Sequence, residues 1–190
     1  MKTISGAAFG TILLLSAAGP AHANLVTNGN FGTGDFTGWT NPAGSGIGID
    51  QSFPATGDTY DASFTGTGTL SQSIATTAGT SYTVSFSLLD ESGLNSDTFT
   101  VGFGTFTDTI TGDTANPYTT ESFIVPAADI TGTSTMLSFQ APPPGSSGTW
   151  NLDDVSVTAA AIPEPATGGL LAAAGLLVLS LAGRIRARRG

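Results

Sequence analysis

Carboxylates are the side chains in the central part of this chain that could support acid–base or metal chemistry. Residues 24–162 contain 13 of the 14 acidic residues and no Lys, Arg, His or Cys. A Ser-His-Asp triad, a thiolate nucleophile, a Schiff-base lysine and a His-ligated zinc site all need side chains that this region lacks. Two kinds of chemistry remain: glycoside hydrolysis by a pair of acids, or an oxygen-ligand site for Ca²⁺.

Glycoside hydrolysis is the weaker of these two possibilities. A carboxylate pair can hydrolyse glycosides when its members lie about 5 to 10 Å apart. Here no basic side chain could orient a substrate or tune either pKa, and 13 acids in one region form close pairs by chance. We therefore expect no catalytic residue, and a carboxylate-based glycoside hydrolase ranks third among the functions considered.

The charge of this region also limits its partners. Double-stranded nucleic acids are bound by Lys and Arg, which displace counterions from the phosphates. Because residues 24–162 have no basic side chain, we expect no nucleic-acid partner. A field of one sign opposes compaction unless the acids are separated, protonated or bridged by a cation. A divalent cation, with Ca²⁺ as the candidate, is therefore an expected ligand.

Short runs of alternating apolar and polar residues must position these acids. In residues 82–88, every second side chain is large and apolar, with Ser and Thr between, as is typical of a half-buried strand. No part of the region shows a convincing apolar stripe of period 3.6. The expected strands cover residues 47–53, 60–64, 69–74, 82–88, 99–103, 123–125, 136–139 and 152–157. We predict an all-β domain over residues 24–161, an antiparallel β-sandwich (jelly roll) of eight or more strands.

The N-terminal segment 1–23 has the three parts of a secretory signal peptide. Lys2 supplies the basic start, residues 4–18 are apolar, and Ala21-His22-Ala23 offers a small-x-small cleavage site. We expect cleavage after Ala23 and export of the chain. A single membrane anchor is the alternative, but the apolar stretch is short and ends in Gly19-Pro20.

The C-terminal segment 162–190 has a second three-part pattern. Pro163-Glu164-Pro165 precedes an uncharged apolar run at 167–183, and the basic tail 184–190 contains four arginines. As a helix, the apolar run would rise about 25 Å, just short of a ~30 Å hydrocarbon core. The arginines would stay cytoplasmic and leave the central domain outside. Residue types alone favour a plain transmembrane anchor helix with a basic stop.

This pattern resembles the PEP-CTERM sorting signal of exported bacterial proteins, with Ile162 where valine is more usual. The resemblance implies that Pro163, Glu164 and Pro165 are read in an extended conformation by an exosortase, a membrane transpeptidase-like enzyme that cuts near the motif. The chain would be the substrate. The resemblance also implies a Gram-negative bacterium that makes exopolysaccharide, with transient inner-membrane anchoring before transfer to the cell surface or extracellular matrix.

Two segments of the central domain resemble galactose-binding-like jelly rolls and carbohydrate-binding modules. Residues 24–39 are similar to their opening, and residues 150–157 to their closing strand. In these families a structural calcium joins the two segments, and Asp153 matches the closing ligand. Gly32 stands where a Glu is usual, which is a departure from the pattern. The resemblance implies a calcium ligand at Asp153. Asn30 and Asp35 could supply oxygens nearby, and Asp58 is a candidate for the middle ligand.

The alternation of side chains along the closing strand gives a separate argument about which face of the sheet carries Asp153. Residues two apart on a strand share a face, so Asp153 is predicted to lie with Val155 and Val157, which look like core residues. A carboxylate on a core face needs a cation or several donors. Trp150 and Leu152 would share the opposite face, which leaves this argument open. For Asp35, Asp50 and Asp58, residue type and position favour solvated turn residues over metal ligands.

Carbohydrate binding usually needs exposed aromatic platforms, and the sequence does not locate one. Trp39 and Trp150 lie in segments that look structural, so core packing is favoured for both. Tyr60, Phe106 and Tyr118 are weaker candidates near loops. We infer an exported, non-catalytic envelope or matrix protein with a structural or adhesive role in exopolysaccharide or biofilm. The alternative is a carbohydrate-binding module that recognises exopolysaccharide.

Overall fold

The computed structural model describes residues 23–53, 55, 57–91, 97–112, 118–141 and 148–160. The predicted signal peptide, except Ala23, lies outside these ranges. So does the predicted sorting segment 162–190 with Pro163, Glu164 and Pro165. Within the described ranges, no helix has the length and apolar character needed to cross a membrane.

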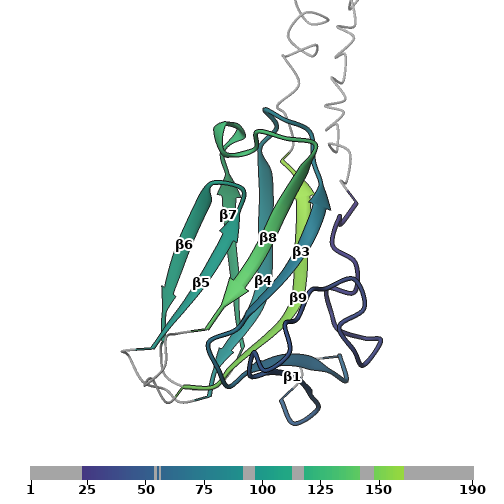
Figure 1. Ribbon diagram of the computed structural model, residues 1–190, viewed down its shortest axis with the longest axis vertical. Coiled ribbons are helices and arrows are strands. Elements are labelled where there is room, and N and C mark those ends of the chain that lie inside the picture. The colour runs from purple at the N-terminus through teal and green to yellow at the C-terminus, as the bar shows by residue number, and fades with distance from the viewer. Residues whose placement is uncertain are drawn as a thin grey trace, which may run out of the picture.

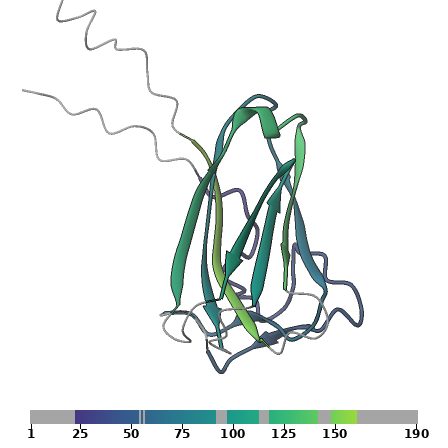
Figure 2. The ribbon, with the colours of Figure 1, turned by 90° about the vertical axis from the view of Figure 1, so that its left-hand side faces the viewer.

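The described residues form two antiparallel sheets that face each other (Figures 1 and 2). Most strands run along the length of the molecule, whereas β1 lies across one end (Figure 1). One sheet has the order β1-β2-β9-β4-β7, with bounds Ile47–Asp50, Asp61–Phe64, Trp150–Ala159, Tyr82–Asp90 and Thr119–Val125. The other has the order β3-β8-β5-β6, with bounds Thr69–Ala75, Ser134–Gln140, Thr98–Phe103 and Phe106–Thr111. A 3-10 turn, η1, covers Ala127–Asp129. The predicted β-sandwich is confirmed.

Strand β6 is the element that the apolar pattern did not predict. It joins β5 through a two-residue turn at Gly104 and Thr105, and it is an edge strand with no buried residue. An edge strand with both faces partly in water needs little apolar alternation, so its sequence resembles a polar loop. In the same way β1 ends at Asp50, three residues before the predicted end, because the chain turns there.

The core between the sheets is rich in aromatic side chains. Phe139 lies at its centre, with ring centroids 6.1 Å from Trp39, 5.2 Å from Phe86 and 6.1 Å from Phe99. Trp39 and Trp150 are both buried, which confirms that they are core residues and not exposed sugar platforms. These ring distances lie in the range of favourable edge and tilted aromatic contacts. Aromatic packing is therefore a large part of the contact between the two sheets.

The opening segment lies alongside the closing strand. Leu25 N–H donates to the Val157 carbonyl (2.9 Å), and Val155 N–H donates to the Gly29 carbonyl (2.9 Å). The Asn24 side chain accepts from Val157 N–H (3.0 Å) and donates to the Val155 carbonyl (3.1 Å). A Cβ at Gly29 would lie only 2.1 Å from the Val155 oxygen, so glycine permits this close approach.

A β-bulge in β9 corrects the predicted parity of Asp153. Ser85 of β4 pairs with Ser156, but Ser87 pairs with Asp153, so β9 carries one extra residue. Asp154 has a φ of +52°, as a bulge residue can. The extra residue shifts the alternation, and Leu152 and Val155 both belong to the core. Asp153 therefore lies on the outer face, opposite to the prediction.

Candidate functional site

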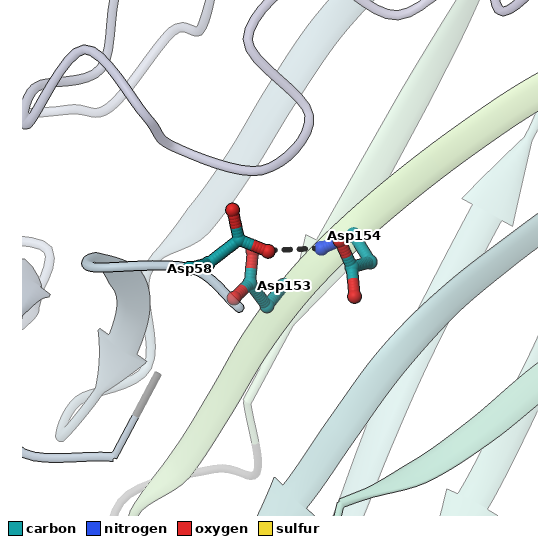
Figure 3. Close-up of side chains that lie close together, drawn as sticks. All are labelled: Asp58, Asp153 and Asp154. Atoms are coloured by element: carbon teal, nitrogen blue, oxygen red, sulfur yellow. Dashed lines mark hydrogen bonds between the residues drawn. The ribbon is translucent and has the colours of Figure 1, made fainter. Parts of the chain in front are cut away.

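Three carboxylates converge beside the bulge in β9. Each of Asp58, Asp153 and Asp154 offers an oxygen, and these oxygens all lie within 4.8 Å of one another (Figure 3). Asp153 and Asp154 come from β9, and Asp58 comes from the segment between β1 and β2. The bulge explains the arrangement, because two successive strand residues would otherwise point to opposite faces.

Backbone groups hold two of the three acids in place. Asp153 is fully buried, and its Oδ2 accepts the N–H of Ala55 (3.1 Å) while its Oδ1 accepts the N–H of Asp154 (2.8 Å). A turn in which Asp58 N–H donates to the Ala55 carbonyl (3.0 Å) brings Asp58 to the same place. The Asn30 side-chain amide donates to Asp58 Oδ1 (3.1 Å), which adds a residue from the opening segment.

Burial and mutual repulsion oppose ionisation of this group. Burial raises the pKa of Asp153 to about 7, and the neighbouring charges of Asp154 and Asp58 act in the same direction despite the two backbone N–H donors. The pKa of Asp154 is also raised, first by burial and then by the charge of Asp58. A nearby cation would reverse these effects, because it favours the charged form of each carboxylate.

The structure brings some of the predicted calcium ligands together and separates another. Asp153 and Asp58 lie in the cluster, and Asn30 contacts Asp58. Asp35 lies in an exposed turn outside it, where its Oδ1 accepts from the Thr33 hydroxyl (2.7 Å) and Thr37 N–H (2.9 Å). These hydrogen bonds, led by that of Thr33, lower the pKa of Asp35. Calcium binding itself stays a prediction.

Asp154 was not among the predicted ligands. The sequence offered one indication of its role, the adjacent acids Asp153 and Asp154. Regular strand alternation places neighbouring side chains on opposite faces, so the two acids were not expected to share a site. The bulge that joins them depends on the positive φ of Asp154, a conformation that Asp adopts more readily than most residues. Beside Asp154 lies a pocket of about 310 Å³, lined by Asn24, Val26, Asn28, Gly29, Asn30, Asp154 and Val155.

Phe53 is the exposed aromatic side chain of the described residues, with 41% of its surface accessible. Asp50 Oδ1 accepts the N–H groups of Gln51 (2.7 Å) and Ser52 (3.1 Å), which turns the chain at the end of β1 just before Phe53. Tyr60, Phe106 and Tyr118, named from the sequence, are only half-exposed. Phe53 was missed because it was placed inside the first predicted strand.

Comparison with known proteins supports the fold and leaves the family open. No family profile and no curated protein sequence matches the chain. Among solved structures, a family 61 carbohydrate-binding module in complex with β-1,4-galactotriose has a TM-score of 0.55 at 17% identity, covering 72% of this chain and 99% of that one. A family 16 carbohydrate-binding module has a TM-score of 0.58 at 14% identity, covering 71% and 99%.

Two further structures show the contexts in which this fold occurs. The CBM22-1 xylan-binding domain of Xyn10C from Paenibacillus barcinonensis has a TM-score of 0.53 at 16% identity, covering 76% of this chain and 99% of that one. An arabinose-bound α-L-arabinofuranosidase has a TM-score of 0.56 at 17% identity, but only 27% of that chain is covered. The central domain therefore has the jelly-roll fold of carbohydrate-binding modules.

Proposed function

We propose that this chain is an exported, non-catalytic carbohydrate-binding module. The observation that carries the proposal is the fold, whose similarity extends over almost the whole length of several independent carbohydrate-binding modules. These matches favour carbohydrate binding over the purely structural or adhesive role inferred first from the sequence. Absence of Lys, Arg, His and Cys from residues 24–162 supports a binding role without catalysis.

The sugar would stack on Phe53. Apolar faces of sugar rings are bound by aromatic side chains, and exposed Phe53 can offer one without rearrangement of the core. The segment that carries it also carries Ser52 and Asp58, whose oxygens could accept hydrogen bonds from sugar hydroxyls. The segment is fixed to β9 through Ala55 and Asp153, so the platform rests on the five-stranded sheet.

A calcium ion would have a structural role in this proposal. Ca²⁺ takes oxygen ligands, and Asp58, Asp153 and Asp154 supply three carboxylates in a region without a basic side chain. The donor set therefore fits the ion. Held there, it would neutralise the repulsion within the cluster and tie the segment of Phe53 to β9. We expect Ca²⁺ to raise the melting temperature more than Mg²⁺ does, because Mg²⁺ demands a stricter octahedral geometry.

The two terminal segments complete the proposal. Segment 1–23 would direct export, and Pro163, Glu164 and Pro165 would present the chain to an exosortase, so that the domain reaches the cell surface or extracellular matrix of a Gram-negative bacterium. There its ligand would be the exopolysaccharide of the producing cell. The export assignment rests on the signal-peptide pattern of segment 1–23, and the sorting assignment rests on the resemblance of segment 162–190.

The test is binding of the purified chain, residues 1–190 in a mild detergent, to exopolysaccharide and to xylo- and β-1,4-galacto-oligosaccharides. We expect saturable binding in calorimetry, and Phe53→Ala should weaken it about fivefold, because loss of one stacking contact costs about 1 kcal/mol. Ile124→Ala is the matched control, since Ile124 is 65% exposed on β7. Absence of binding to every glycan would contradict the proposal and favour the structural role.

A further inference from the structure

A second group of polar side chains is buried on the outer face of the five-stranded sheet. In β2, Ala62 and Phe64 belong to the core, so Asp61 lies on the opposite face. In β9, Trp150 and Leu152 belong to the core, so Asn151 also lies on that outer face. Although this face is turned away from the core, both Asp61 and Asn151 have no accessible surface.

The register places these two side chains on neighbouring strands. Ala62 pairs with Leu152 and Ser63 with Asn151, so Asp61 and Asn151 are diagonal neighbours on one face. In an antiparallel sheet the Cβ atoms of diagonal neighbours lie about 7 Å apart. The side-chain oxygens extend beyond the Cβ atoms and can approach each other between the two strands. A single ion that binds oxygens at about 2.4 Å can therefore contact the Asp61 carboxylate and the Asn151 amide together.

Hydrogen bonds fix the orientation of both groups and leave one oxygen of each without a donor. The Tyr118 hydroxyl donates to Asp61 Oδ2 (2.7 Å), and Asn151 Nδ2 donates to Glu91 Oε1 (2.6 Å). The opposite orientation of the Asn151 amide would place its oxygen against the Glu91 carboxylate, where two acceptors would repel each other. The Asn151 atom without a partner is therefore the oxygen Oδ1. Asp61 Oδ1 and Asn151 Oδ1 are buried and accept no hydrogen bond from the protein.

The surroundings of these two oxygens are acidic. Asp50 pairs with Asp61 across β1 and β2, and Glu91 adjoins Asn151. The pKa of Asp61 is raised, chiefly by burial, although the Tyr118 hydrogen bond lowers it, and the charges of Asp50 and Glu91 add to the increase. A buried acceptor without a donor costs about 1–3 kcal/mol, and more when it is charged. No Lys or Arg lies between residues 3 and 183 to meet this need.

We propose that Asp61 Oδ1 and Asn151 Oδ1 bind a hard divalent cation, such as Ca²⁺, at a second site between β2 and β9. Glu91 and Asp50 supply the surrounding negative charge, and water or Glu91 completes the ligand shell. The site has its own ligands, although the register of β2 and β9 also brings Asp153 of the first cluster opposite Asp61. It does not depend on sugar binding, and its role is to close the outer face beneath Tyr118.

The test counts bound Ca²⁺ on the full chain by equilibrium dialysis at pH 7. We expect the double variant Asp58→Asn, Asp154→Asn, which leaves Asp153 as the one carboxylate of the first cluster, to keep one Ca²⁺ bound per chain. Addition of Asp61→Asn to this variant should leave none. Asp61→Asn alone should lose one Ca²⁺ relative to the unmutated chain. Asp108→Asn, an exposed change on β6, is the control and should leave the count unchanged.

Asp61→Asn is chosen because the protein should still fold. Its amide oxygen can accept from Tyr118, and its amide nitrogen can donate to Asn151 Oδ1, which near-UV circular dichroism will check. Terbium luminescence offers a second measurement, since Tyr118 bonds to Asp61 and Trp150 adjoins Asn151 in the chain. If the variant Asp58→Asn, Asp154→Asn binds neither Ca²⁺ nor Tb³⁺, or if Asp61→Asn leaves the count unchanged, the second site is overturned. A buried water or proton then joins the two oxygens.

Discussion

Replacement of Asp153 by Asn should remove a defined part of the pH dependence of stability. Burial raises the pKa of Asp153 to about 7 in the folded, cation-free chain, against an ordinary value of 3.8. The folded state therefore keeps a proton that the unfolded state releases between these values. The resulting stability is fully present below about pH 4 and is lost as the pH rises through 7.

The magnitude follows from the pKa of Asp153. Between the two pKa values, each pH unit lowers the free energy of unfolding by about 1.36 kcal/mol. From pH 5 to pH 8 the unmutated chain should therefore lose about 2.5 kcal/mol through Asp153. Asn cannot ionise, so Asp153→Asn should lack this loss. Its amide nitrogen would face either Ala55 N–H or Asp154 N–H, which costs about 1–3 kcal/mol at every pH and leaves the slope unaffected.

Urea denaturation in EDTA at pH 5 and pH 8, followed by tryptophan fluorescence, measures both quantities. Asp35→Asn is the matched control, because Asp35 has a lowered pKa and stays ionised from pH 5 to pH 8, so its contribution is constant there. An equal decline in stability for the unmutated chain and Asp153→Asn would show that Asp153 titrates normally. That result would refute our account of the buried cluster.

Two further changes test other contacts by the same denaturation assay. Gly29→Ala should lower the free energy of unfolding by about 2 kcal/mol or more, because its Cβ would lie 2.1 Å from the Val155 oxygen. Gly48→Ala in β1 is the control, since its Cβ would have no atom within 4 Å and stability should change little. Equal effects of the two changes would contradict the packing argument. Tyr118→Phe removes the hydroxyl donor from buried Asp61 and should lower the free energy of unfolding by about 1–3 kcal/mol. The loss should be larger at pH 8 than at pH 5, because the donor stabilises the ionised carboxylate. A pH-independent loss would argue against this hydrogen bond.

The fold could be predicted from the sequence because most strands have one face in the core. In β4, the core residues Tyr82, Val84, Phe86 and Leu88 alternate with polar ones. Burial follows that pattern up to Phe86, after which every residue to the end of the strand is buried. Strand β6 has no fully buried residue, and only Phe106 and Ile110 pack partly buried against the core, so a core face constrained its sequence weakly. Prediction from apolar periodicity therefore succeeds where one face is buried and fails at the edge of a sheet.

The candidate site could be predicted only in part, because its geometry depends on backbone features that leave weak sequence signals. Asp153 was found by resemblance, but the parity argument for it was wrong. A single residue with positive φ, Asp154, shifts the register of β9 and places both acids beside Asp58. The same shift keeps Leu152 and Val155 in the core on either side of the bulge. Deletion of Asp154 would restore plain alternation, with Leu152 and Val155 in the core and Asp153 on the outer face, but it would remove one of the three carboxylates from the cluster. The bulge therefore allows one strand to serve both the aromatic core and the acidic cluster.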